Sequence, residues 1–305
     1  RLSPPQCTRA LIHPVRTEYS VLLVHGINDS AYYMADVGEL LYRNGFNVIT
    51  VLLPGHGTNT KDMLNVKAEQ WRSEVELGLK MASLVGKKIM LGGFSLGGAL
   101  AIDAVLRHQD IHGLLLFSPA IRLRSYDSIA ALACAPGLRS YMVETKLMRN
   151  PVKYKRRAGN GACQLSRLMQ HNLAFADNDT GESRAKSNRL RKMARRVRIP
   201  TFLAMSYADA RISPRTMLEF AGSVPAPVFV ATFGSTEHAD APVLSNGGTI
   251  RHIADDNLPH SFLVRRSNPH NGQKNPYFDL LGEAVIDFLN EHFHLTKMSV
   301  VDRGE

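Results

Sequence analysis

The 305-residue sequence lacks several features that would place it in a special class of protein. No apolar run approaches the roughly 18 residues that are needed to cross a bilayer. Only three cysteines are present, without any Cys-x-x-Cys, which excludes a dense disulfide framework and gives no sign of a zinc site. Neither an internal repeat nor a low-complexity linker is present. The remaining composition, 44% hydrophobic and 21% charged, is typical of one large globular domain with an insertion.

Acidic residues are missing from one stretch that carries much of the net charge of +10. Eight basic residues lie between 184 and 198, and a second basic cluster occupies 153–157. One interpretation is the solvated face of a helix in an inserted segment. The other is attraction to an anionic lipid surface or an acidic substrate. Nucleic acid is not expected as a partner, because the clusters lack interleaved aromatic residues and no nucleic-acid-binding motif is present.

The cysteines leave at least one thiol unpaired. Cys134 and Cys163 lie in the same segment and could pair in an exported protein, whereas a reduced, buried role for both is the other interpretation. The chain begins with Arg1 rather than Met, which indicates that a signal peptide or an expression tag preceded it. We expect an exported location in preference to a cytoplasmic one, and the sequence leaves the oligomeric state open.

Apolar strands alternate with amphipathic helices through the first 117 residues. Strands are predicted at 19–25, 46–53, 88–92 and 111–117, and helices at 31–44, 66–85 and 96–108. This alternation is typical of an α/β fold in which helices cover both faces of a parallel sheet. After an interruption, it resumes with strands at 200–205, 227–233 and 249–253, and helices at 213–222 and 284–294.

The interruption between the two halves is basic and contains two or three short helical patches. We interpret it as a cap, or lid, over the carboxyl edge of the sheet. The predicted organisation is a first core part at 1–120, a cap insertion at 121–198 and a second core part at 199–305. Apolar residues of the cap are either a pocket for a medium acyl chain or ordinary packing, and they include Leu147, Met148, Leu168 and Met169.

One motif in the first half carries chemistry. Gly93-Phe94-Ser95-Leu96-Gly97 reads G-x-S-x-G and stands between a predicted strand and a predicted helix. In that setting the motif is a nucleophile elbow, a sharp turn that exposes the Ser95 hydroxyl above the sheet. Glycines two residues to either side leave room for strand and helix to approach. Ser95 is therefore the predicted nucleophile.

A serine nucleophile needs a base, and the base needs an acid that orients it. Asp209 follows the strand at 200–205 and is the predicted acid, with a turn aspartate or a cap for the next helix as alternatives. Three histidines follow the last core strands, His238, His260 and His270. Spacing alone leaves the base open, and each could equally be a surface-loop residue. His13, His108, His112 and His171 are expected to lie in surface loops.

The oxyanion of an acyl-transfer reaction needs preorganised N–H donors. One is predicted to be the backbone N–H of Leu96, directly after the nucleophile. The other is predicted to be the N–H of Ile27, in the loop that follows the first strand. His25 and the glycine-rich loop around His56 are expected to be structural, because both precede the serine in chain order.

Three motifs in this order resemble the α/β-hydrolase superfamily: His25-Gly26, Leu53-Pro54-Gly55-His56-Gly57 and the G-x-S-x-G segment. The likeness is greatest to the branch that holds monoglyceride lipases, small carboxylesterases and serine aminopeptidase-like hydrolases, and it covers 19–120 and 200–222. The Pro- and Asn-rich stretch from Leu258 to Tyr277 is similar to the histidine loop of exported bacterial esterases in this branch. This resemblance favours His260 over His238.

The resemblance implies an α/β-hydrolase fold and hydrolysis of a carboxylic ester through an acyl-enzyme, with no metal and no cofactor. The expected partner is a small-molecule ester or lipid, and contact with an anionic membrane would be compatible with it. An amide or thioester hydrolase with the same triad is an alternative, as is a non-catalytic small-molecule receptor on the same fold.

Overall fold

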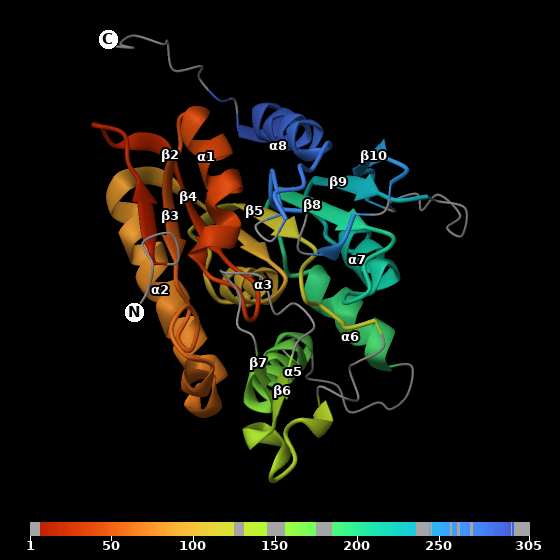
Figure 1. The fold of residues 1–305 in the computed structure, drawn as a ribbon. Coiled ribbons are helices and arrows are strands. Elements are labelled where there is room, and N and C mark those ends of the chain that lie inside the picture. The colour runs from red at the N-terminus through yellow and green to blue at the C-terminus, as the bar shows by residue number, and fades with distance from the viewer. Residues whose placement is uncertain are drawn as a thin grey trace.

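The computed structural model describes residues 7–124, 131–144, 156–174, 185–235, 244, 246–256, 258–260, 263–268, 271–293 and 295. Its central sheet has eight strands in the order β1-β3-β2-β4-β5-β8-β9-β10. All neighbouring strands are parallel except β1, which pairs antiparallel with β3 at one edge (Figure 1). In this order, β2, β4, β5 and β8 occupy the middle of the sheet, so the loops at their carboxyl ends meet at one edge.

The strands coincide closely with the predicted apolar runs. They are β1 (Arg9–Leu11), β2 (Thr17–Val24), β3 (Asn47–Val51), β4 (Gly86–Phe94), β5 (Ile111–Phe117), β8 (Thr201–Ser206), β9 (Val228–Phe233) and β10 (Thr249–Ala254). Successive residues of a strand point to opposite faces. Val21 and Leu23 accordingly belong to one buried cluster, and Leu22 and Val24 to the other.

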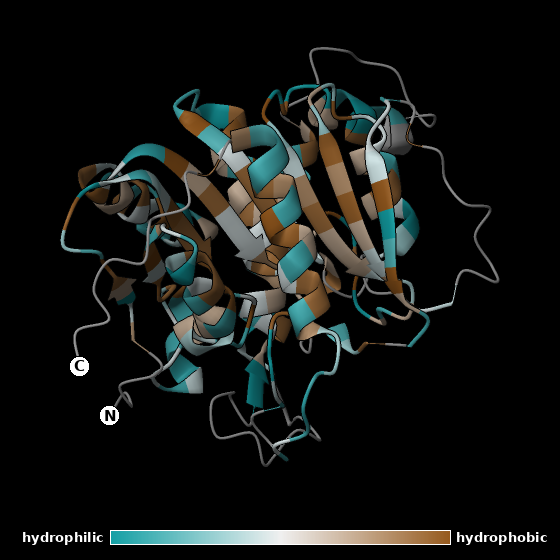
Figure 2. Ribbon diagram, turned by 90° about the horizontal axis from the view of Figure 1, so that it is seen from above, coloured by the Kyte–Doolittle hydropathy of each residue, from teal (hydrophilic) through white to brown (hydrophobic). Residues whose placement is uncertain are grey.

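Helices cover both faces of the sheet. α1 (Ala35–Arg43) and α8 (Phe278–Phe293) pack on one face, and α2 (Ala68–Val85), α3 (Leu96–Arg107) and α7 (Pro214–Ala221) on the other. Figure 2 shows the result, with hydrophobic strands at the centre and hydrophilic residues on the outer sides of the helices. The predicted helix at 284–294 was too short, since α8 begins at Phe278. The predicted helix at 31–44 is a 3₁₀ turn, η2 (Ala31–Met34), followed by α1.

The segment between β5 and β8 forms structures that the sequence did not predict in detail. It contains a short 3₁₀ turn, η4 (Leu138–Ser140), and an antiparallel hairpin of β6 (Met142–Glu144) and β7 (Arg156–Ala158). Two helices follow, α5 (Gly159–Ala174) and α6 (Ala185–Ala194). β6, β7 and α5 lie below the sheet in Figure 1. The boundaries of the cap at 121–198 remain a prediction.

A disulfide joins the segment before η4 to the cap helix α5. Cys134 is bonded to Cys163 of α5, which decides between the two interpretations of these cysteines in favour of pairing. The connection is long-range, with a sequence separation of 29 residues. Cys7, the third cysteine, is partly exposed.

Amide side chains of α5 fasten the cap to the core. Asn160 Nδ2 donates to the carbonyl oxygens of Met63 and Val66, both at 2.8 Å. The Gln164 side chain accepts from the first N–H of α2 at 3.1 Å, and Asn172 Nδ2 donates to Ala99 O of α3 at 2.8 Å. Met63 belongs to the 3₁₀ turn η3 (Thr60–Asn65). The root of the cap is therefore bonded to the elements that surround the predicted nucleophile.

The basic stretch at 184–198 lies on the solvent side of α6 as far as the structure describes it. Leu190, Met193 and Val197 are buried, whereas five arginines of this stretch are exposed, namely Arg189, Arg191, Arg195, Arg196 and Arg198. Lys153 and Lys155 of the second basic cluster lie outside the described residues. No helix in the described part of the chain is long and apolar enough to cross a membrane.

Candidate active site

The turn between β4 and α3 has the strained backbone that a nucleophile elbow requires. Ser95 has φ 56° and ψ −112°, a conformation that non-glycine residues rarely adopt. The other described non-glycine residues with positive φ are Asn28 and Ser118. All three follow the carboxyl ends of the adjacent strands β2, β4 and β5. Backbone strain in the described chain is thus concentrated at one point of the sheet edge.

Close approach of backbones makes the glycines of the elbow necessary. A Cβ on Gly97 would lie 2.0 Å from Val24 O, and a Cβ on Gly93 would lie 2.2 Å from Gly97 O. The Ser95 N–H donates to Phe117 O at 3.1 Å, and Ser95 O accepts from Ala120 N at 2.8 Å. The serine is therefore held by main-chain contacts with β5 as well as by its own turn. Leu96 is the first residue of α3, where the N–H has no acceptor within the helix.

Asp209 lies in the loop after β8 and is fully buried. Its Oδ1 accepts from the N–H groups of Arg211 and Ile212 at 2.8 and 3.0 Å, and its Oδ2 lies 2.6 Å from His260 Nδ1. Burial alone would raise the pKa of Asp209, but the bond to His260 and the two backbone donors outweigh it and lower the pKa. The carboxylate is therefore ionised and oriented toward the imidazole. The helix cap that was its alternative role is supplied by Ser213 instead.

His260 is held between this carboxylate and the elbow. Its ring centroid lies 4.7 Å from that of Phe94, the residue before Ser95, and its side chain is 16% exposed. The structure thus brings Asp209 and His260 together across 51 residues of sequence and places the imidazole against the elbow. His238 and His270, the other candidates for the base, lie outside the described residues.

The loop after β2, which contains Ile27, is a tight turn in which Asp29 N donates to Gly26 O at 3.3 Å. Two buried histidines, His25 and His56, pack beside this turn. His25 bonds Gly26 O through Nδ1 at 2.8 Å and accepts the Leu53 N–H at Nε2 at 3.1 Å, and its ring lies edge-to-face with His56. Burial lowers the pKa of His25 to about 4 and that of His56 to about 3. Both are neutral packing residues, as expected from the sequence.

Side chains from far away in the sequence anchor the loop that carries His260. Buried Arg265 donates through Nη1 to Tyr32 O at 2.8 Å, and the same nitrogen lies 3.1 Å from Asp36 Oδ2. Its guanidinium stacks over the Tyr32 ring at 4.1 Å. Asn275 bonds the Arg265 carbonyl from the other side at 3.1 Å. The histidine loop is therefore attached to η2 and α1, directly after the loop of Ile27.

An arginine that sequence analysis missed braces the acid loop. Arg124 Nη1 donates to Asp209 O at 3.1 Å, and Arg124 N donates to Arg211 O at 2.9 Å. A β-bridge joins Leu123 to Ile212 beside these bonds. No sequence signal identified this contact, because it depends on where the cap leaves β5.

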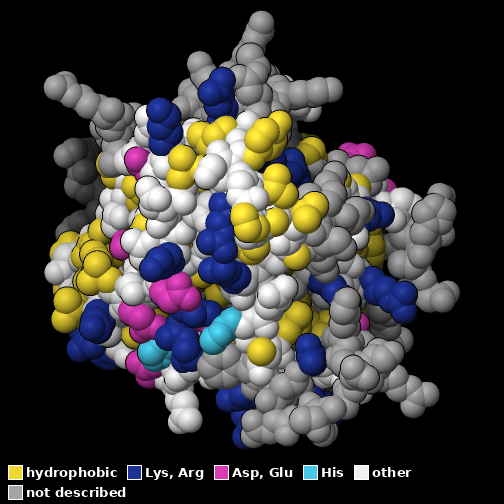
Figure 3. Space-filling model, turned by 90° about the horizontal axis from the view of Figure 1, so that it is seen from below, with side chains coloured by type: hydrophobic (Ala, Val, Ile, Leu, Met, Phe, Trp, Pro, Cys, Tyr) yellow, Lys and Arg dark blue, Asp and Glu magenta, His cyan; other side chains and the backbone are white. Residues whose placement is uncertain are grey.

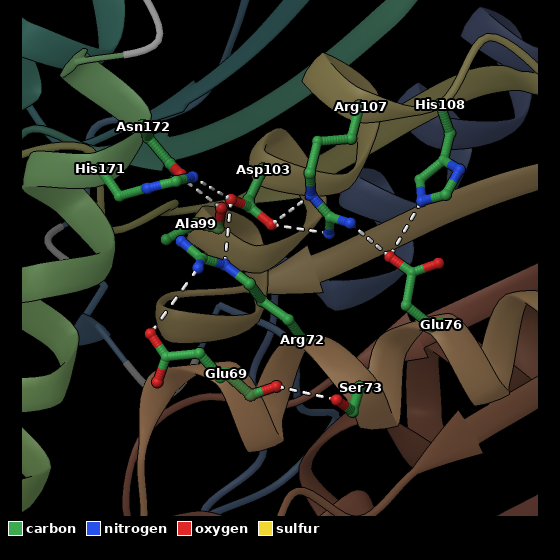
Figure 4. A network of polar contacts seen from close by, with 10 residues as sticks. All are labelled: Glu69, Arg72, Ser73, Glu76, Ala99, Asp103, Arg107, His108, His171 and Asn172. Atoms are coloured by element: carbon green, nitrogen blue, oxygen red, sulfur yellow. Dashed lines mark hydrogen bonds and ion pairs between the residues drawn. The ribbon is translucent and has the colours of Figure 1, made fainter.

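A polar network joins the far end of the nucleophile helix to the cap (Figure 4). Asp103 of α3 is fully buried and pairs with Arg72 Nε at 3.2 Å and Arg107 Nη2 at 2.7 Å. His171 of α5 approaches the same carboxylate at 3.6 Å. Burial, and then repulsion by Arg72, lower the pKa of His171. The expectation that His171 lies in a surface loop was therefore wrong.

Of the other three histidines, His13 and His108 lie between elements, as expected, whereas His112 lies on a strand. His108 caps the end of α3 and pairs with Glu76 at 2.9 Å, and His13 stacks on Tyr42 with ring centroids 4.1 Å apart. His112 is exposed on β5. These residues lie away from the carboxyl ends of β4 and β8 and do not approach the Asp209–His260 pair.

A mostly parallel sheet covered on both faces, with a strained serine turn after a central strand, defines the α/β-hydrolase class. The family model "Serine aminopeptidase, S33" matches residues 16–238, and the chain belongs to this family. The fold and the resemblance expected from the sequence are both confirmed.

Two curated relatives match part of the chain. A thermostable monoacylglycerol lipase of Bacillus sp. (strain H-257) is 30% identical over 163 residues, which is 52% of this chain and 64% of the lipase. A phospholipase of Bacillus subtilis (strain 168) is 26% identical over 107 residues, 34% of this chain and 41% of the phospholipase. The chain therefore spans less than two thirds of the length of either relative.

Solved structures share the fold over nearly the whole chain. A metagenome-derived lipolytic enzyme superposes with a TM-score of 0.69 at 18% identity, covering 96% of this chain and 100% of the other. A monoglyceride lipase variant of Saccharomyces cerevisiae gives 0.66 at 15% identity, covering 93% and 90%. The monoacylglycerol lipase of Paleococcus ferrophilus gives 0.62 at 18%, covering 93% and 98%. At these identities the likeness shows the fold alone.

Proposed function

We propose that this chain is a serine hydrolase that cleaves carboxylic esters through an acyl-enzyme. Ser95 Oγ bonds to the ester carbonyl carbon while His260 Nε2 takes the hydroxyl proton. As the tetrahedral intermediate collapses, the bond to the alcohol oxygen breaks and His260 returns the proton to that oxygen. Water then repeats both steps on the acyl-enzyme, which releases the carboxylic acid and restores Ser95.

The negative charge of the intermediate falls on the former carbonyl oxygen. The backbone N–H groups of Leu96 and Ile27 are the proposed donors to it. The position of Leu96 at the start of α3 supports the first assignment, because the dipole of the helix favours an anion there. The position of Ile27 in a tight turn after the neighbouring strand β2 supports the second.

The observation that carries the proposal is the pair of buried Asp209 and partly buried His260 beside the elbow. An ionised carboxylate at 2.6 Å from Nδ1 holds a proton on that nitrogen, which leaves Nε2 as the acceptor that a base needs. The receptor alternative does not call for this arrangement. A buried carboxylate and an oriented imidazole next to a strained serine are the parts of acyl-transfer chemistry.

The proposed substrate class is a lipid-like acyl ester. The activities named for the two curated relatives, a monoacylglycerol lipase and a phospholipase, support it. So do Leu168 and Met169 of α5, which are buried in the same apolar cluster as Leu96 and could line an acyl pocket. Leu147 and Met148 lie outside the described residues.

A finer element of the proposal is contact between the cap and an anionic lipid surface. Leu132 and Tyr141 are exposed by 59% and 64%, and Leu138 between them is exposed by 40%. Hydrophobic side chains gather among Lys and Arg on the face seen from below (Figure 3). An apolar tip beside basic side chains suits insertion between anionic headgroups. Salt-sensitive binding to anionic vesicles, absent with neutral vesicles, would support it.

The first experiment is hydrolysis of p-nitrophenyl esters from acetate to palmitate, with Ser95→Ala alongside. We expect turnover that Ser95→Ala abolishes and that His260→Ala reduces by about a thousandfold or more. The chain-length optimum reports the depth of the acyl pocket. A fluorophosphonate probe should label Ser95 in the native protein and not in the variant.

His238→Ala is the matched control for the base, and we expect it to retain activity. Activity lost in His238→Ala but kept in His260→Ala would overturn the assignment of the base. A folded protein that hydrolyses no ester but labels with the probe points to an amide or thioester substrate. A protein that neither turns over nor labels, yet binds ligands, would be a receptor.

A further inference from the structure

The side chains of two arginines near the elbow have no hydrogen-bond or ion-pair partner among the described residues. Arg157 of β7 is half-buried, and Arg211, in the acid loop, is exposed. Within the described part of the chain, neither side chain makes a hydrogen bond or an ion pair. Buried guanidinium groups are normally paired, because removing the charge from water costs free energy that only a partner offsets. Arg157 therefore has no counter-ion among the described residues, although its partial burial favours one.

The charges near Arg157 do not supply that counter-ion. Burial lowers the pKa of Arg157, repulsion by Arg211 lowers it further, and attraction by Asp29 opposes these effects more weakly. An arginine remains charged at neutral pH in spite of such a shift. Among the charges that act on Arg157, repulsion by Arg211 therefore outweighs attraction by Asp29.

Sheet topology places this positive charge above the reaction centre. Asp29 follows β2, and Arg211 follows β8. The sheet order is β2-β4-β5-β8, so β4 with Ser95 and β5 with Ser118 lie between them. Neighbouring strands are about 4.8 Å apart, so the two loops are separated by about 14 Å. The charges of Asp29 and Arg211 both act on Arg157, as expected for a cap residue between these two loops, over the ends of β4 and β5.

Contacts of the cap support this position independently. β7 and α5 both pack against η3, and a Cβ on Gly161 of α5 would lie 3.4 Å from Ile27 Cδ1. The strand that carries Arg157 therefore continues directly into a helix that touches the predicted oxyanion loop. Ala158, the next residue, is buried in the cluster that contains Leu96. Successive residues of a strand project to opposite faces, so Arg157 projects from the face of β7 opposite Ala158.

We propose that Arg157 and Arg211 form an anion-binding subsite that receives a phosphate or carboxylate group on the ester substrate. Guanidinium groups bind both anions through paired N–H donors. The anion would supply the counter-charge that Arg157 lacks and would fix the ester over Ser95. The inference rests on the proposed function and deepens it, since it assigns an acidic ester as the preferred substrate.

The test compares matched acidic and neutral esters. One arm uses a 1-acylglycerol 3-phosphate against the monoacylglycerol with the same chain, and the other uses p-nitrophenyl hydrogen glutarate against p-nitrophenyl valerate. We expect Arg157→Gln to lower the ratio of kcat/KM, acidic over neutral, by about tenfold or more in at least one arm. The arm that responds shows whether the anion belongs to the alcohol or to the acyl part.

Arg156→Gln is the matched control, because Arg156 is the neighbouring exposed residue on β7, and it should leave the ratio unchanged. Inorganic phosphate should inhibit the unmodified protein competitively, and Arg211→Gln should weaken that inhibition. This arm keeps the proposal testable if Arg157→Gln does not fold. Unchanged ratios and unchanged phosphate inhibition in both variants, with Ser95→Ala inactive, would overturn the subsite alone. Activity in Ser95→Ala would instead overturn the proposed function.

Discussion

The two sides of the candidate site are held in different ways. Ser95 is fixed by main-chain contacts of its own β4–α3 turn and of the neighbouring strand β5. His260 is held by side chains that span the molecule, with Arg265 bonded to Tyr32 across 233 residues of sequence. A local backbone constraint requires particular residues at neighbouring positions, and these form a recognisable motif. Long-range side-chain contacts, such as those of Arg265 with Tyr32 and Asp36, form no such motif. This difference explains why the nucleophile was predicted directly and the base only through a resemblance.

A change that disturbs the backbone packing around Ser95 should abolish both folding and activity. Gly97→Ala would place a methyl group 2.0 Å from Val24 O, where only backbone could move. We expect this variant to give no folded, active protein, as measured by soluble yield and by circular dichroism. Gly282→Ala in α8 is the control, because its new methyl group meets only the flexible end of Leu40 at 3.3 Å. A folded Gly97→Ala with normal activity would contradict the close packing of strand and helix.

The histidine side should lose activity before it loses its fold. Arg265→Met removes the bonds to Tyr32 O and Asp36 and releases the loop of His260. We expect kcat to fall by about a hundredfold with little change in KM, because misplacement of a base affects the chemical step. Arg265→Lys should recover part of the loss.

The neighbouring arginine provides the comparison for this experiment. Arg266 pairs with Asp279 at 2.6 Å on the surface, where both side chains are largely exposed. We expect Arg266→Met to change kcat by no more than about twofold, since exposed ion pairs contribute little. Equal losses of kcat in the Arg265 and Arg266 variants would show that the contacts of Arg265 with Tyr32 and Asp36 have no particular role in positioning His260.

Acid should lower the free energy of unfolding, because it protonates the buried His25 beside the proposed oxyanion loop. The pKa of His25 is lowered by burial from 6.5 to about 4, so the unfolded chain binds this proton more readily than the folded one. This stability is fully present above pH 6.5 and is lost as the pH falls toward 4. We expect His25 alone to lower the free energy of unfolding by about 3 kcal/mol over that interval.

Urea denaturation at several pH values would measure this effect. His112→Gln should leave the pH dependence unchanged, because His112 is exposed. A free energy of unfolding that stays constant from pH 6.5 to 4 would contradict the neutral, buried state of His25.

The core was predictable because its signals are local. The predicted strand at 111–117 has the bounds of β5, and the other core strands deviate by a few residues at their ends. β1 was missed because three residues at an antiparallel edge carry no periodic pattern. The long loop before α8 hid the start of that helix, since Gly282 weakens the helical pattern there.

The cap and its contacts were not predictable for a different reason. Pairing of Cys134 with Cys163 depends on how the segment before η4 folds onto α5, and spacing alone left it open. The same holds for Arg124 and His171, whose partners come from other elements. Such contacts are set by tertiary packing, and no periodicity records them.

The contacts that hold the loop of His260 determine when the candidate site can be completed during protein synthesis. The elbow and its sheet neighbours are complete once the first 124 residues have left the ribosome, and chains generally fold in that direction. The residues that position His260 are synthesised much later, namely Asp209, Arg265 and Asn275. The turn of the nucleophile is thus complete before the residues that position the proposed base have been synthesised.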